Sequence, residues 1–262
     1  MNAIQCSPRV LSTIILVAIL ATSCEPQDEP VVPASQQSAM KSSQQSDGTE
    51  SQATVSARER MVQSQFAARD IINKRVLEVM RRVPRHEFVP NGRRDSAYDD
   101  HPLPIGEGQT ISQPYIVALM TQLVDPQPSD KALDVGTGSG YQAAVLAELV
   151  KHVYSIEIVE PLADRADATL KRLGYENVTV RHGDGYHGWK SEAPFDLIIV
   201  AAAPDHIPEE LVKQLAPEGK MVIPVGSRWQ TLILIEKKAD GTIRKHNVAP
   251  VAFVPMTGEA DR

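Results

Sequence analysis

The chain of 262 residues has few cysteines and no recognisable metal-binding pattern. Its two cysteines, Cys6 and Cys24, both lie in the first segment, so the rest of the chain can form neither an internal disulfide nor a thiolate metal site. The histidines His182, His187 and His206 show no metal-ligand spacing either. We therefore expect a fold that its hydrophobic core stabilises, without a disulfide or a metal ion.

An excess of positive charge is also absent. The formal net charge of -6 opposes a phosphate backbone and argues against a nucleic-acid partner. One stretch, from Arg58 to Arg94, is locally basic, and its charges include Lys74, Arg75, Arg81, Arg82, Arg85 and Arg93. We interpret these charges as solvated helix faces, with the docking of an acidic partner as the alternative. The length suits one sizeable α/β domain with appendages.

The first 24 residues resemble an export signal. Arg9 precedes an apolar run from Leu11 to Ala21, which is short for a membrane span and has the length of a secretory signal's hydrophobic region. The run ends before Cys24 in a pattern similar to a bacterial lipoprotein signal, although Leu20 lies one residue earlier than usual. The sequence predicts a signal-like leader over residues 1–24, with membrane anchoring through Cys24 as a further possibility.

Residues 25–57 are rich in Ser, Gln and Pro and have few large apolar side chains. Burial of so little apolar surface does not offset the entropy of ordering the chain, so we expect a flexible tether here and a folded domain over residues 58–262. Helical apolar spacing predicts helices over Arg58–Ala68 and Asn73–Arg82, with Asn73 as N-cap. The Pro- and Gly-rich segment His86–Pro114 is expected to be a long irregular connection and part of an active site.

From Ala132 onward, short apolar runs alternate with helical segments. Strands are expected at 132–135, 153–158, 178–181, 195–201 and 221–225, and helices at 141–150, 161–173 and 208–215. This alternation predicts an α/β fold with a doubly wound, mostly parallel, Rossmann-like sheet. Runs at 231–237 and 247–254, with a turn at 239–241, predict an antiparallel hairpin at one sheet edge. Such a sheet is typical of the class I, S-adenosylmethionine-dependent methyltransferase fold.

A glycine-rich turn follows the first of these strands, in the sequence Leu-Asp-Val-Gly-Thr-Gly-Ser-Gly from 133 to 140. In a Rossmann-like sheet such a turn lets backbone approach a nucleotide and leaves free N–H groups at the start of a helix. The spacing of Gly136, Gly138 and Gly140 is G-x-G-x-G, which suits a cofactor without a pyrophosphate. Asp134, just before the turn, is placed to attract a cationic amino-acid moiety.

Two more carboxylates follow neighbouring strands. Glu157 lies 17 residues (157 minus 140) after the last glycine, where it could accept hydrogen bonds from both ribose hydroxyls. Asp184, after the next strand, could hold an adenine amino group. Each carboxylate alone is more often an exposed residue at a strand end. Together they lie on the rim where open α/β sheets bind ligands, so we predict one cofactor site there.

Six segments of the sequence resemble the protein-L-isoaspartate O-methyltransferase family, between Met61 and Gly258. They are 82–90 (RVPRHEFVP), 106–114 (GEGQTISQP), 133–141, 182–185 (HGDG), 195–202 (FDLIIVAA) and 254–258 (VPMTG). The resemblance implies an active-site serine at Ser112. It also implies contacts with S-adenosylmethionine at Thr110, Ile111, Gly136, Gly138, Glu157, Asp184 and Gly185.

The implied reaction methylates the α-carboxylate of L-isoaspartyl residues in damaged proteins, and the resemblance implies a monomer that tolerates varied peptides. A cytoplasmic location follows from the family and its cofactor supply, whereas the leader points to export or a lipid anchor. A methyltransferase acting on a small molecule or another protein group, and a non-catalytic exported binding module, are the alternatives. A serine hydrolase is set aside, because Thr137 breaks the G-x-S-x-G pattern at Ser139.

Overall fold

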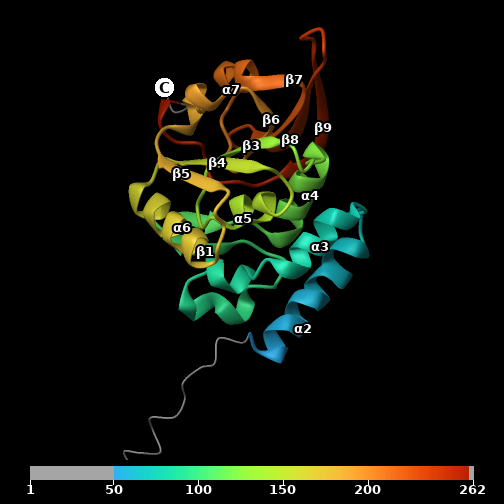
Figure 1. Ribbon diagram of the computed structural model, residues 1–262, viewed down its shortest axis with the longest axis vertical. Coiled ribbons are helices and arrows are strands. Elements are labelled where there is room, and N and C mark those ends of the chain that lie inside the picture. Colours follow the sequence, from blue (N-terminus) through green and yellow to red (C-terminus); the bar gives the residue numbers. More distant parts are fainter. Residues whose placement is uncertain (1–49, 260–262) are drawn as a thin grey trace, which may run out of the picture. The chain divides into compact units, whose positions relative to one another are not determined.

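The computed structural model describes residues 50–259 of the chain (Figure 1). The predicted leader, most of the predicted tether and Cys24 lie outside these residues. Within the described range, no helix is both long and apolar enough to cross a membrane.

The domain begins with a helical segment that starts earlier than its apolar spacing indicates. α2 (Gln52–Met61) begins inside the predicted tether, because the Ser51 hydroxyl accepts a hydrogen bond from the backbone N–H of Thr54 (3.1 Å). A π-helical turn, η1 (Val62–Ala67), extends it. α3 (Lys74–Arg82) has the predicted cap, since the Asn73 side chain accepts from two backbone N–H groups of the first turn.

The connection after α3 is less irregular than its composition indicates. It contains the 3₁₀ turns η2 (Arg85–Phe88) and η3 (Asn91–Ser96) and a small hairpin of β1 (Leu103–Gly106) and β2 (Gln109–Ile111). It leads into α4 (Pro114–Val124), a helix that the sequence patterns did not predict. Most residues of α4 are buried, and a helix that is apolar on nearly all sides has no amphipathic period to recognise.

The main sheet has seven strands in the order β5-β4-β3-β6-β7-β8-β9. Its strands are β3 (Lys131–Val135), β4 (His152–Glu157), β5 (Val178–His182), β6 (Phe195–Val200), β7 (Leu215–Val225), β8 (Gln230–Lys237) and β9 (Ile243–Val251). The first five pair in parallel, and β8 and β9 form the predicted antiparallel hairpin at the edge. The predicted α/β fold class is therefore confirmed.

Helices cover both faces of this sheet (Figure 1). α4, α5 (Tyr141–Ala147) and α6 (Glu160–Arg172) pack on one face, in a core that also contains apolar residues of α2 and α3. α7 (Glu209–Gln214) and the 3₁₀ turns η4 (Gly185–His187) and η5 (Lys190–Glu192) lie on the other side, over a smaller core. The strand order reverses at β3, which has β4 on one side and β6 on the other. A ligand crevice is therefore expected at the carboxyl end of β3.

A buried hydrogen-bond network links β3 and β4 next to the glycine turn. Ser155 donates its hydroxyl proton to Oδ2 of Asp134 (2.7 Å), and the hydroxyls of Ser155 and Thr137 lie 2.6 Å apart. Asp134 is fully buried, and its Oδ1 has no hydrogen-bond partner among the described residues. Burial and, to a smaller extent, the charge of Glu157 raise the pKa of the Asp134 carboxyl to about 7, against the opposing effect of the Ser155 hydrogen bond.

This raised pKa predicts that Asp134 makes the domain less stable as the pH approaches neutrality. The carboxyl has a pKa of about 7 in the folded state and 3.8 as an ordinary side chain, so the folded state binds the proton more tightly. Its stabilising contribution is complete below pH 3.8 and is lost as the pH rises through about 7. Asp134→Asn, which remains neutral, should lack this dependence.

Urea unfolding of the full chain between about pH 4 and about pH 8 measures the effect. Over the interval between the two pKa values, the free energy of unfolding of the wild type should fall relative to that of Asp134→Asn, by about 1.4 kcal/mol for each unit of pH. Parallel pH profiles for the two proteins would contradict a raised pKa.

Candidate active site

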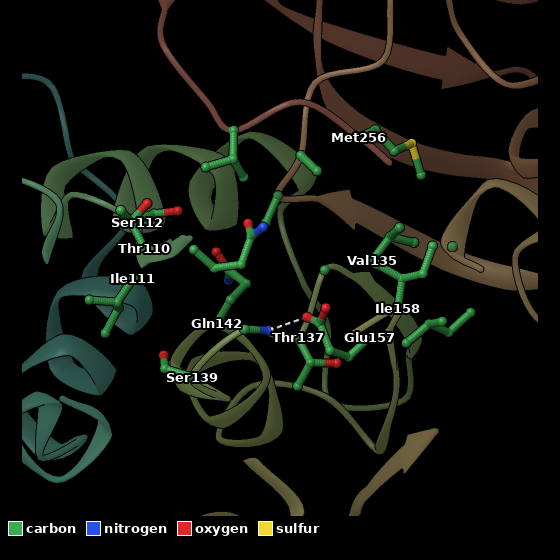
Figure 2. A pocket seen from close by; sticks show the side chains of 18 of the residues that line it. Thr110, Ile111, Ser112, Val135, Thr137, Ser139, Gln142, Glu157, Ile158 and Met256 are labelled. Atoms are coloured by element: carbon green, nitrogen blue, oxygen red, sulfur yellow. Dashed lines mark hydrogen bonds between the residues drawn. The ribbon is translucent and has the colours of Figure 1, made fainter. Parts of the chain in front are cut away.

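A pocket lies at the carboxyl ends of the central strands, where segments distant in sequence meet (Figure 2). It contains about 790 Å³ of space not filled by atoms, part of it open to solvent. Its walls come from the β2 segment, the glycine turn and the residues that follow β4, β6 and β9. The lining residues are Gln109–Ser112, Val117, Val135–Ser139, Tyr141, Gln142, Ile156–Ile158, Gly185, Ala201, Ala202 and Val254–Thr257.

Seven of the nine predicted site residues are brought together here. Thr110, Ile111, Ser112, Gly136, Gly138, Glu157 and Gly185 all line the pocket. Figure 2 shows the Thr110–Ser112 segment on one side of the pocket and Ile158 on the other, with Glu157 between them. The two predicted residues that do not line it are Asp134 and Asp184.

The glycine turn is held in shape by Glu157. Gly136 and Gly138 have φ angles of 90° and 53°, in the left-handed region that favours glycine. The backbone N–H of Gly138 donates to Oε2 of Glu157 (2.7 Å, dashed in Figure 2), and the N–H of Val159 donates to Oε1 (3.0 Å). A carboxylate can accept about four hydrogen bonds, so Glu157 keeps capacity to accept from ligand hydroxyls in the pocket.

Asp184 contacts backbone groups beside the pocket. Its carboxylate accepts hydrogen bonds from the backbone N–H groups of Tyr186 (2.9 Å) and Glu259 (2.9 Å), so it caps η4 and ties the C-terminal segment to it. Nε2 of the nearby His187 lies 2.6 Å from a carboxylate oxygen of Glu259. The neighbour Gly185 reaches the pocket wall. A contact of Asp184 with an adenine amino group stays a prediction.

Asp134 lies behind the pocket wall rather than in it. Its side chain is fully buried and is hydrogen-bonded to Ser155, while the next residue, Val135, lines the pocket. The predicted attraction of a cationic moiety by Asp134 is not tested by this geometry and stays a prediction.

The Ser112 segment is positioned by a buried arginine. Arg85 is 0% exposed; its Nη2 donates to the backbone carbonyl of Ser112 (2.8 Å), and its Nε donates to that of Ala97 (2.7 Å). Its guanidinium lies 4.8 Å from the centre of the Tyr141 ring, within cation–π range. Burial lowers the pKa of Arg85 to about 10, which leaves it charged at neutral pH.

The interpretation of the basic stretch as solvated helix faces is therefore wrong for two of its residues. Arg85 is enclosed as described, and Arg58 is buried against Tyr98, with its guanidinium paired to the carboxylate of Glu50. The partners of both arginines include groups distant in sequence, the carbonyl of Ser112 for Arg85 and the hydroxyl of Tyr98 for Arg58. Nη1 of Arg85 has no hydrogen-bond partner among the described residues. The spacing of charges in a helix carries no information about such partners.

Other lining residues were not among the predicted site residues. Ser139 lies in the glycine turn, Gln142 follows it, Ala201 and Ala202 follow β6, and Val254–Thr257 follows β9. The last segment returns to the central strands, because the N–H of Met256 donates to the carbonyl of Ala203 (2.9 Å). The residues after β6 and after β9 lie in segments that resemble the family, 195–202 and 254–258, but no local pattern shows that 254–257 returns to the central strands.

The lining favours a nucleoside ligand without phosphate groups. Among the described residues no lysine or arginine lines the pocket, so no cationic side chain is placed there to pair with a pyrophosphate. Glu157 is its single acidic side chain, and apolar groups such as Val135, Ile158 and Met256 form much of the wall. These features fit S-adenosylmethionine, which joins a ribose and an adenine to an amino acid through sulfur.

Similar sequences point to the same family as the segments described above. The chain is 58% identical over 197 residues to protein-L-isoaspartate O-methyltransferase 2 of Syntrophobacter fumaroxidans, and the aligned region covers 74% of this chain and 80% of the relative. It is also 58% identical over 190 residues to the protein of the same name from a Polaromonas species, covering 72% and 90%.

Solved structures agree as well. A structure described as protein-L-isoaspartate O-methyltransferase superposes with a TM-score of 0.70 at 28% identity, covering 78% of this chain and 67% of that one. A beta-aspartate methyltransferase of Plasmodium falciparum, solved with S-adenosyl-L-homocysteine, gives 0.66 at 29% identity, covering 78% and 98%. A sequence model described as protein-L-isoaspartate(D-aspartate) O-methyltransferase matches residues 56–261. The chain therefore belongs to the protein-L-isoaspartate(D-aspartate) O-methyltransferase family.

Proposed function

We propose that this protein transfers a methyl group from S-adenosylmethionine to the α-carboxylate of L-isoaspartyl residues in damaged proteins, which initiates their repair. The observation that carries the proposal is the pocket itself. In a chain of this family, one pocket combines the Thr110–Ser112 segment with the glycine turn and Glu157. The resulting ester can cyclise to a succinimide and partly reopen as normal aspartate.

Glu157 and the glycine turn would hold the cofactor. When bound, S-adenosylmethionine supplies a methyl group activated by a positively charged sulfur. Glu157 has remaining acceptor capacity for ribose hydroxyls, and its bond to the N–H of Gly138 keeps turn and carboxylate together. Val135, Ile158 and Met256 provide apolar contacts and exclude water from this part of the pocket.

The side chains on the acceptor side match a reaction that needs no general base. A carboxylate is already an anionic nucleophile at neutral pH, and among residues 50–259 no histidine or lysine lines the pocket as a candidate base. Positioning in a water-poor site then supplies much of the rate. The hydroxyl of Ser112 would donate a hydrogen bond that orients the substrate carboxylate, while Arg85 fixes the backbone of the same residue.

The proposal is tested by transfer of labelled methyl groups from S-adenosylmethionine to two peptides that differ only in L-isoaspartate or L-aspartate. We expect a base-labile methyl ester on the isoaspartyl peptide alone. No transfer to either peptide, by protein that still binds the cofactor, would refute the proposal and favour a small-molecule acceptor. Failure to bind the cofactor would favour a non-catalytic binding module.

Ser112→Ala should reduce kcat/KM for the isoaspartyl peptide by about one to two orders of magnitude, because a hydrogen bond to a charged group is lost. The fold should be unchanged, since Arg85 bonds to the Ser112 backbone and not to its side chain. Ser64→Ala, at an exposed helical position away from the pocket, is the matched control. Equal kcat/KM values for the two variants would remove Ser112 from the site.

Glu157→Ala should mainly weaken cofactor binding, by about 10- to 100-fold in Kd, through loss of hydrogen bonds to a carboxylate. Calorimetric titration with S-adenosylhomocysteine measures the affinity. Glu157→Gln, which retains one acceptor oxygen, should lose less, and Glu160→Ala, at an exposed position on α6, should lose nothing. A Glu157→Ala affinity equal to that of Glu160→Ala would exclude the proposed ribose contact.

A further inference from the structure

A second and larger hollow opens beside the pocket. It is a groove with about 1440 Å³ of empty space, part of it open solvent. Thr110, Ser112, Ala201 and Val254 line both the groove and the pocket. The groove's other lining residues are Pro102, Gln113, Ile116, Arg228–Thr231 and Pro250–Phe253. A molecule lying in this groove would therefore present a group to Ser112, at the boundary with the pocket.

The far side of the groove is a rigid wall. The Gln230 side chain donates to the carbonyl of Phe253 (3.0 Å) and accepts from its N–H (2.6 Å), which fixes the segment after β9 to β8. Within the β7–β8 turn, Gly226 has a φ of +127° and lies too close to the carbonyl oxygen of Trp229 for a side chain, so the turn requires glycine there. The groove is thus preformed, so binding there costs little ordering of the protein.

This turn exposes an indole at the groove. Trp229 is 84% exposed, and within residues 50–259 the only other exposed large hydrophobic side chain is Ile72. Rigid aromatic side chains supply large contact areas at binding surfaces, so an indole left in water beside a groove indicates a binding role. The guanidinium carbon of Arg228 lies 5.9 Å from the centre of the Trp229 ring.

The charge of the groove restricts the ligand. Arg228 is the single ionisable side chain among the groove's lining residues, and it has no ion-pair partner in the described part of the chain. One cation on a protein of net charge -6 does not attract a polyanion such as a nucleic acid. The mixture of apolar groups, one indole and one guanidinium instead matches an extended peptide with an apolar and an acidic side chain.

We propose that this groove holds the polypeptide that flanks the methyl-accepting residue, and that Trp229 and Arg228 set a preference among flanking sequences. Trp229 packs against an aromatic or large aliphatic side chain near the acceptor, and Arg228 pairs with an acidic one. This inference rests on the proposed methylation of isoaspartyl residues. It adds that the β7–β8 turn makes some isoaspartyl sites better substrates than others.

The test compares isoaspartyl peptides in which each position flanking the acceptor carries alanine, phenylalanine, glutamate or lysine in turn. The full chain is assayed at saturating S-adenosylmethionine. At one flanking position, phenylalanine should raise kcat/KM over alanine by about three- to tenfold, and Trp229→Ala should remove this advantage by lowering kcat/KM more for the phenylalanine peptide than for the alanine peptide. Arg228→Gln should likewise remove a preference for glutamate over lysine. Ile72→Ala, which changes an equally exposed residue outside the groove, is the matched control.

A binding measurement gives a second readout. The chain contains two tryptophans, of which Trp189 is buried and Trp229 exposed. With S-adenosylhomocysteine present, the phenylalanine-flanked peptide should shift the fluorescence emission to the blue as Trp229 is covered, and Trp229→Phe should abolish the shift while retaining most of the preference.

The outcomes separate this inference from the proposed function. If wild-type protein methylates isoaspartyl peptides but Trp229→Ala lowers kcat/KM equally for all of them, or for none, the inference is overturned and the proposed function stands. If no isoaspartyl peptide is methylated by the wild type, both are overturned. Equal effects of Trp229→Ala and Ile72→Ala would also refute a role for the turn.

Discussion

The position of Ser112 depends on one buried cation. The hairpin that carries this residue is not part of the seven-stranded sheet, so no strand of that sheet fixes it. Arg85 does so through the carbonyls of Ser112 and Ala97, and its guanidinium also lies near the ring of Tyr141, the first residue of α5 after the glycine turn. Removing a guanidinium from water is costly, and the two hydrogen bonds and the contact with the ring offset part of this cost, while Nη1 has no hydrogen-bond partner among the described residues. The same cation therefore links the acceptor side of the site to the cofactor side.

The cofactor side is organised in advance by a different charge. Glu157 already accepts two backbone N–H groups, one of them from Gly138, so the turn and the carboxylate are in place before a ligand arrives. The buried network of Asp134, Ser155 and Thr137 supports the same turn from behind. A site whose polar groups are held by such surrounding bonds loses little entropy on binding, which benefits affinity and the alignment that methyl transfer requires.

The sequence predicted the fold class, because alternating apolar runs are local features. The glycine turn and the strand-end carboxylate Glu157 indicated the rim where the pocket lies, whereas Thr110–Ser112 were indicated by the family resemblance. The sequence did not predict α4, whose nearly complete burial leaves no period to detect. Nor did it distinguish Asp134 and Asp184 from Glu157, since all three follow or end strands. Their difference is the direction of the side chain, toward Ser155 for Asp134 and toward the backbone for Asp184. The burial of Arg85 likewise depends on carbonyls that only the folded chain brings near.

The site therefore combines two kinds of support. Ser112 is coupled to the core through a buried arginine, so changes near that arginine should disturb both stability and chemistry. Trp229 and Arg228 lie on a tight, exposed turn whose side chains contribute little to the core, so substitutions there should change the free energy of unfolding little. Trp229 and Arg228 line the groove but not the pocket, so the turn can vary while the residues that line the pocket stay the same. This arrangement lets the preference for flanking sequences change independently of the methyl-transfer geometry.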